Sequence, residues 1–181
     1  MRELSLNVLD IAQNSISANA TLIEIELKES AEDNKLLVGI YDNGKGMSKE
    51  QLIAVRDPFF TTRTTRKVGM GIPLFKMAAE MTGGHLEIES EIGVGTKVKA
   101  FFNTDHLDFI PVGDMASTMV MLITMNESID FIYTRHNNEK SFTLDTRILK
   151  EILNGVPFSE PSVSAWLRDY IKENTREITE V

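Results

Sequence analysis

The chain of 181 residues contains no cysteine, which excludes disulfides, thiolate nucleophiles and thiol-ligated metal sites. No apolar run is long enough to span a membrane, and the first ten residues lack the apolar core of a secretory signal. The three histidines, His85, His106 and His136, lie far apart in the sequence and form no local metal motif. We therefore expect a cytoplasmic protein with no membrane partner.

Basic charge is also scarce, because the net charge is -8 at pH 7. A negative surface argues against a large nucleic-acid interface, so we expect no nucleic acid among the partners. The hydrophobic fraction of 42% and the charged fraction of 25% are those of an ordinary globular protein. A chain of this length can bury one substantial core, or one core plus a small appendage.

Hydrophobic periodicity predicts a helix at the start of the chain. Its apolar residues recur at helical spacing, at Leu6, Leu9, Ala12, Ile16 and Ala20. Strict alternation of apolar and polar residues then predicts a half-buried strand over 21–30. A second apolar strand runs from Lys35 to the glycine-rich segment 42–46.

The next part of the chain alternates between helix and strand signals. Ser48 and Gln51 have the spacing of a capping box and predict a short helix. Helical character follows over 72–81, and strands at 85–91 and 96–103 flank a hairpin turn. We place a domain boundary after this hairpin, with one domain at 1–104 and an uncharacterised α+β region at 105–181.

The first element that we predict in the second region is a strand at 118–126. Further strands are predicted at 129–135 and 141–145, followed by helices at 146–155 and 162–178. Four methionines, Met115, Met119, Met121 and Met125, either fill gaps in the core or form an adaptable surface for a partner.

Three short motifs each allow a structural and a functional interpretation. The sequence DNGKG at 42–46 is typical of a turn, and GMG at 69–71 can serve simply to ease a tight turn. Glycines before a helix can also expose amides that bind phosphate. The segment 61–67, TTRTTRK, is either a solvated loop or a lid that brings cations over phosphates.

The first helix contains two residues that are poorly suited to a helix interior, Asp10 and Asn14. Residues four apart lie above one another on a helix, so both side chains share one face. Their presence in a helix with one apolar face that can pack into a core calls for an explanation other than packing.

The order of these motifs resembles the GHKL superfamily of ATP-binding proteins, which includes histidine kinases, type II topoisomerases, Hsp90 chaperones and MutL. The segment 10–27 resembles the first motif of the MutL type, and the segments 57–63 and 69–90 resemble the histidine-kinase catalytic domain. The resemblance covers about residues 5 to 103. It implies an α+β fold, the two-layer α/β sandwich of the histidine-kinase-like (Bergerat) ATPases, here with a small α+β C-terminal extension.

The resemblance also implies that ATP and Mg²⁺ are bound. Asn14 would provide an oxygen to Mg²⁺, which prefers hard oxygen ligands. Asp42 would accept a hydrogen bond from the adenine amino group, because a carboxylate is only an acceptor. Other nucleotide-binding positions would be Gly44, Gly46, Met47, Arg63, Lys67, Gly69, Met70, Gly71, Ile72 and Thr96, with Thr96 supporting the contact of Asp42 with adenine.

Asp10 is the candidate catalytic residue. In the ATP-hydrolysing branches of the superfamily a Glu at this position orients the attacking water, and Asp is one methylene shorter. Asp10 either acts as a general base through its water or only hydrogen-bonds a metal-bound water. Ser17 departs from the histidine-kinase pattern, where a Lys is common, so Arg63 or Lys67 would supply the missing cation.

Three functions are consistent with the resemblance. The first is transfer of the γ-phosphoryl group to a protein partner, as in anti-sigma serine kinases or a detached kinase catalytic subunit. For this function we expect no phosphoacceptor-histidine domain upstream. We also expect structural roles for the three histidines. The second is a sensor that binds nucleotide without turnover and changes which partner the C-terminal region holds. The third is a slow ATPase clamp with Asp10 as its base. A homodimer is compatible with each.

Overall fold

The computed structural model describes residues 3–57 and 70–180. Its helices and strands follow one another as α1 (Leu4–Ser17), β1 (Leu22–Ser30), β2 (Lys35–Asp42), α2 (Lys49–Arg56), α3 (Gly71–Met81), β3 (His85–Glu91), β4 (Gly95–Asn103), α4 (Met115–Met125), β5 (Asp130–Asn137), β6 (Lys140–Asp145), α5 (Thr146–Leu153) and α6 (Pro161–Thr179). No described helix is both long and apolar enough to cross a lipid bilayer.

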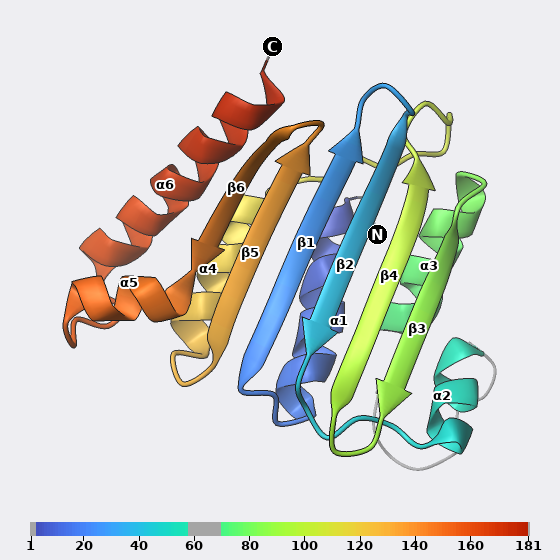
Figure 1. The fold of residues 1–181 in the computed structure, drawn as a ribbon, viewed down its shortest axis with the longest axis horizontal. Helices are drawn as coiled ribbons and strands as arrows, with labels where there is room; N and C mark the ends of the chain where they lie inside the picture. The colour runs from blue at the N-terminus through green and yellow to red at the C-terminus, as the bar shows by residue number, and fades with distance from the viewer. Residues whose placement is uncertain (1–2, 58–69, 181) are drawn as a thin grey trace.

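The described strands form one six-stranded sheet in the order β3-β4-β2-β1-β5-β6 (Figure 1). The pairs are antiparallel except β1 with β5, which run parallel. Helices α1, α3 and α4 lie behind the sheet in Figure 1. This α+β architecture, with a sheet as one layer and helices as the other, confirms the predicted fold class.

The alternation predicted for 21–30 is confirmed in β1. Ile23, Ile25 and Leu27 are buried against the helices, while Glu24 and Lys28 point to the uncovered face. On that second face Tyr41 donates a hydrogen bond to Glu26 Oε2 at 3.1 Å. Burial, together with the neighbouring Glu26 carboxylate, raises the pKa of Tyr41 above its usual value.

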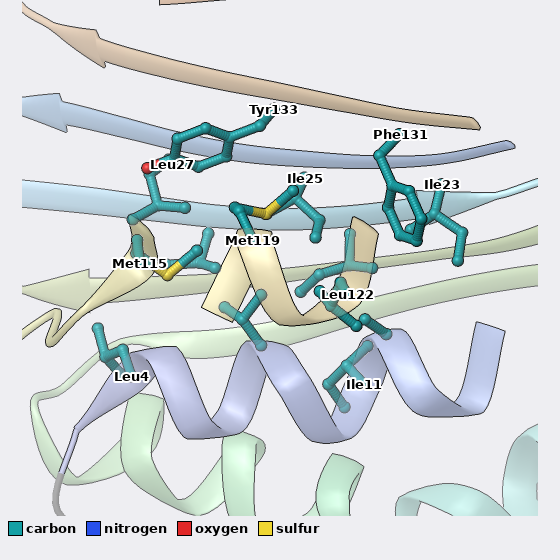
Figure 2. Packing of buried hydrophobic residues seen from close by; sticks show 14 of the residues in the cluster. Leu4, Ile11, Ile23, Ile25, Leu27, Met115, Met119, Leu122, Phe131 and Tyr133 are labelled. Atoms are coloured by element: carbon teal, nitrogen blue, oxygen red, sulfur yellow. The ribbon is translucent and has the colours of Figure 1, made fainter. Parts of the chain in front are cut away.

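The predicted strand at 118–126 is wrong, because these residues belong to helix α4. Asp114 begins the helix: its Oδ1 accepts a hydrogen bond from the Ser117 amide at 2.9 Å. A continuous apolar run does not distinguish a buried strand from a helix that is buried on several sides. Figure 2 shows why this helix is so apolar: Met115, Met119 and Leu122 lie between α1 and the strands β1 and β5.

Both predicted regions contribute to one hydrophobic cluster. Its members include Leu4 and Ile11 from α1, Met119 from α4 and Phe131 from β5 (Figure 2). The sheet likewise continues from the first region into the second through the pairing of β1 with β5. Residues 105–181 are therefore packed as an extension of the first region's core.

Four of the five apolar residues predicted for the core face of the first helix are buried or pack against the core, and Leu6 is the exception. Leu6 is 40% exposed, whereas Leu4, Val8 and Ile11 are buried. The polar residue Ser15 continues this buried stripe with 3% exposure. The predicted apolar stripe was thus correct except at Leu6, but it left out the buried residues Leu4, Val8 and Ile11.

Thr146 begins α5 and attaches this helix to strand β5. It is fully buried, and its Oγ1 accepts a hydrogen bond from the Phe131 amide at 2.8 Å. Thr146→Val should leave this buried amide without a partner and lower the free energy of unfolding by about 1–3 kcal/mol. Urea denaturation measures this change, with Thr143→Val on the exposed face of β6 as the control. Equal stability of the two variants would contradict the assigned role.

Candidate functional site

A cavity of about 480 Å³ opens where the C-terminal half of α1 meets the ends of β2 and β4. This end of the sheet is at the bottom of Figure 1, beside the loop that follows β2. The lining is mostly apolar with a few polar groups, as is common for small-molecule sites. It consists of Ile11, Gln13, Asn14, Ser15, Ser17, Ala18, Ile40, Asp42, Lys45, Gly46, Met47, Val55, Ile72, Thr96 and Val98.

Among the described residues that line the cavity, Asp42 is the only carboxylate, and it is the last residue of β2. Ser15 donates a hydrogen bond to Asp42 Oδ2 at 2.6 Å, and the Gly44 amide donates one to Oδ1 at 2.9 Å. Each carboxylate oxygen can accept more than one hydrogen bond, so Asp42 keeps acceptor capacity for a ligand.

The loop after β2 is attached to the turn between α1 and β1. Asn43 Oδ1 accepts hydrogen bonds from the amides of Thr21 and Leu22 at 2.8 and 3.0 Å. The Lys45 amide donates to the Ala18 carbonyl at 2.9 Å. These contacts hold the DNGKG segment as a fixed wall of the cavity.

Position 46 has no room for a side chain, because the β3–β4 hairpin lies directly against it. Its φ is +69°, and a Cβ at this position would lie 1.9 Å from the carbonyl oxygen of Glu91. The neighbouring Met47 amide donates to Ser90 Oγ at 2.8 Å, and Ser90 Oγ is 2.8 Å from Thr96 Oγ1. Close packing within the protein itself thus requires this glycine.

Asn14 and the start of α3 form another part of the cavity. Asn14 is half-buried and lines the cavity, as does the buried Ile72 in the first turn of α3. Asp10 is exposed, lies outside the lining and is adjacent to Gly71: a Cβ built on Gly71 would be 3.3 Å from Asp10 Cβ. Backbone amides at a helix N-terminus can bind an anion, so this end suits a phosphate chain.

The structure brings together Asn14, Asp42, Gly46, Met47, Ile72 and Thr96 in the lining of one cavity. Gly44 lies next to it, with its ideal Cβ position 3.0 Å from Asp42 Oδ1. Met70, the exposed N-cap residue of α3, and Gly71 lie beside it without lining it. Arg63, Lys67 and Gly69 lie outside the described residues.

Lys45 and Ser15 are among the lining residues that were not predicted from the sequence. Lys45 lines the cavity as the x of the Gly-x-Gly segment, where only the glycines were considered. Ser15 supplies the hydroxyl that Asp42 binds, a contact across 27 residues of sequence. The available signal was a serine in the apolar stripe of the first helix, because a buried hydroxyl needs a partner.

The donor set suits a magnesium ion held jointly by protein and ligand. Within residues 3–57 and 70–180, no group of three or more His, Cys, Asp or Glu could hold a metal ion alone. Asn14 offers an amide oxygen from the cavity wall, and Mg²⁺ takes few protein ligands together with water and phosphate oxygens. The residues present therefore fit this ion with a nucleotide.

Comparison with known families gives a match over residues 1–106 to the family described as histidine kinase-, DNA gyrase B-, and HSP90-like ATPase. This range contains every residue that lines the cavity.

Individual relatives are similar over the same part. Sporulation kinase D of Bacillus subtilis is 32% identical over 91 residues, which are 50% of this chain and 18% of that protein. Sensor histidine kinase ZraS of Salmonella typhimurium is 32% identical over 95 residues, 52% of this chain and 20% of that protein. The chain thus spans about a fifth of the length of these relatives.

Two solved structures share the fold. The ADP-complexed MutL ATPase domain of Aquifex aeolicus superposes with a TM-score of 0.52 and 17% identity, covering 85% of this chain and 70% of that one. The N-terminal domain of a DNA repair protein gives a TM-score of 0.56 and 16% identity, covering 80% and 53%. At these identities the likeness shows the fold alone.

Proposed function

This chain belongs to the family of histidine kinase-, DNA gyrase B- and HSP90-like ATPases, and on that premise we propose that it binds Mg-ATP and transfers the γ-phosphoryl group to a protein partner. Residues 1–104 would be the ATP-binding domain, and residues 105–181 a region that contributes to partner contacts. The proposal includes a cytoplasmic location and a surface that binds neither nucleic acid nor membrane, in keeping with the net charge of -8.

The observation that carries this proposal is the position of Asp42 in the lining of an otherwise mainly apolar cavity. Its carboxylate can accept a hydrogen bond from an adenine amino group, while Met47, Ile72 and Val98 provide apolar contacts for the ring. Thr96 and the glycines Gly44 and Gly46 would complete the base-binding part.

The phosphate end is proposed to lie between Asn14 and the N-terminus of α3. Amides around Gly69, Met70 and Gly71 would hold phosphate oxygens, with Arg63 and Lys67 as additional cations. The amide oxygen of Asn14 would orient a bound Mg²⁺, whose charge offsets that of the phosphates. Phosphoryl transfer depends mainly on such positioning and charge neutralisation.

Protein kinase activity is the first choice because the relatives named above are kinases. The test is incubation of the full chain with γ-labelled ATP, Mg²⁺ and the proteins that co-purify with it. Label on a partner protein supports the proposal. Nucleotide binding without label transfer or phosphate release would instead support a sensor, for which the packing of α1 against α4 offers a route to the C-terminal region (Figure 2).

The position of Asp10 favours slow ATP hydrolysis as the alternative, because it lies one turn before Asn14 and beside Gly71. If Asp10 is the general base, Asp10→Asn should lower the rate of phosphate release by about 100-fold or more. Phosphate release is measured at saturating ATP, with Asp33→Asn in the distant β1–β2 turn as the control. A change of only a few-fold would mean that Asp10 does no more than hydrogen-bond a metal-bound water.

A further inference from the structure

Ser15 makes the one side-chain hydrogen bond that the described structure gives to Asp42. It lies in α1 with 3% exposure, and its hydroxyl is 2.6 Å from Asp42 Oδ2. A carboxylate only accepts hydrogen bonds, so the hydroxyl proton must point to Asp42. Hydrogen bonds to a charged acceptor are short and about twice as strong as neutral ones.

Asp42 is held from two sides. The Gly44 amide donates to Oδ1 at 2.9 Å and Ser15 donates to Oδ2, so each oxygen has one fixed donor from the protein. These two bonds together fix the plane of the carboxylate and leave the remaining lone pairs in defined directions. The Gly44 bond alone would fix one oxygen and leave the group free to rotate about it.

Thr96 is the other hydroxyl close to this position, because it pairs with Asp42 across β2 and β4. Its Oγ1 lies 2.8 Å from Ser90 Oγ, and Ser90 in turn accepts from the Met47 amide. The Thr96 hydroxyl is therefore engaged with the β3–β4 hairpin, while Ser15 is engaged with Asp42.

We propose that Ser15 is a positioning residue that determines base specificity: by orienting Asp42 it makes the cavity select purine nucleotides with an amino group at carbon 6. This inference rests on the proposed nucleotide binding. An amino group presents a donor to the oriented carboxylate. A hydrogen atom at carbon 6 gives the carboxylate no hydrogen bond from the base, and an oxo group places two acceptors against each other, which costs affinity.

The test compares affinities for ATP, for purine riboside triphosphate, which lacks the amino group, and for inosine triphosphate, which carries an oxo group. Calorimetric titration with Mg²⁺ should show that the unmodified chain binds ATP about 10- to 100-fold more tightly than the nucleotide without the amino group. In Ser15→Ala this ratio should fall to a few-fold, while the affinity for purine riboside triphosphate changes little. A residue with only a structural role would weaken all three ligands equally.

Ser5→Ala is the matched control, because Ser5 is a buried serine of the same helix whose Oγ has no hydrogen-bond partner in the described structure. It should retain the full ratio. Ser15→Cys keeps the size of the side chain and offers only a weak donor. It should therefore lower the ratio even if the alanine variant folds poorly.

An unchanged ratio in both Ser15 variants would overturn the inference, as would a collapse of the ratio in Thr96→Val but not in Ser15→Ala. These results presuppose that the unmodified chain binds ATP. If it binds none of the three nucleotides, the proposed function itself is refuted, which is a different outcome from ATP binding that does not depend on Ser15.

Discussion

Gly95→Ala is expected to lower the free energy of unfolding by about 3 kcal/mol or more. Gly95 begins β4 opposite the end of β2, and a Cβ there would lie 1.9 Å from the carbonyl oxygen of Asp42 and 2.9 Å from Asn43 Cα. Its φ of +138° is also strained for any residue with a side chain. Both strands must separate to relieve the clash, because the obstructing atoms belong to the backbone.

Urea denaturation of the variant and the unmodified chain measures this loss. Gly93→Ala is the control: Gly93 lies in the same hairpin with φ +79°, and nothing is within 4 Å of its ideal Cβ position. This variant should lose only about 1 kcal/mol, the cost of a left-handed backbone conformation. Equal losses at the two positions would show that backbone conformation, and not contact with Asp42, is the reason for Gly95.

Asp42→Asn is expected to weaken binding of Mg-ATP by about 10- to 100-fold, the value of a hydrogen bond to a charged group. The fold should be retained, because the serine hydroxyl at position 15 can accept from an amide as readily as it donates to a carboxylate. One oxygen of Asp42 would become an NH₂ group, so the adenine amino group would lose an acceptor on that side.

Calorimetric titration of ATP measures this effect. Asp105→Asn removes the same charge from an exposed loop after β4 and should leave the affinity unchanged. Wild-type affinity in Asp42→Asn would show that this carboxylate does not contact the base. Reduced affinity in both variants would instead assign the effect to net charge.

The fold was largely predictable because several local patterns agree with the final structure. The alternation in β1 corresponds residue by residue to its two faces, and Ser48 with Gln51 forms the predicted capping box. Helix α4 was not predicted, because a run that is apolar on all sides has no period. Asp114 caps the first turn of this helix, and an Asp directly before an apolar run is a signal for a helix start that the prediction did not use.

The candidate site was predictable in part, through the resemblance of separated motifs to one superfamily. Asn14, Asp42 and Thr96 come from three of these motifs, and they line one cavity, as the resemblance implies. The contact of Ser15 with Asp42 depends on how α1 packs on β2, which no local pattern specifies. The same holds for Gly46, which lies in the loop after β2 against Glu91 of β3, and for Gly95, which the pairing of β2 with β4 brings against Asp42.

The parallel pairing of β1 with β5 has a consequence for the stability of any shortened form of this protein. β5 covers β1 from Leu22 to Glu29, so β1 is an interior strand only while the C-terminal region is present. Cutting the chain before β5 would leave the peptide groups of β1 open along one side, next to newly exposed apolar side chains. Such a bare strand is a template for intermolecular pairing, so the C-terminal extension also protects the nucleotide-binding half against aggregation.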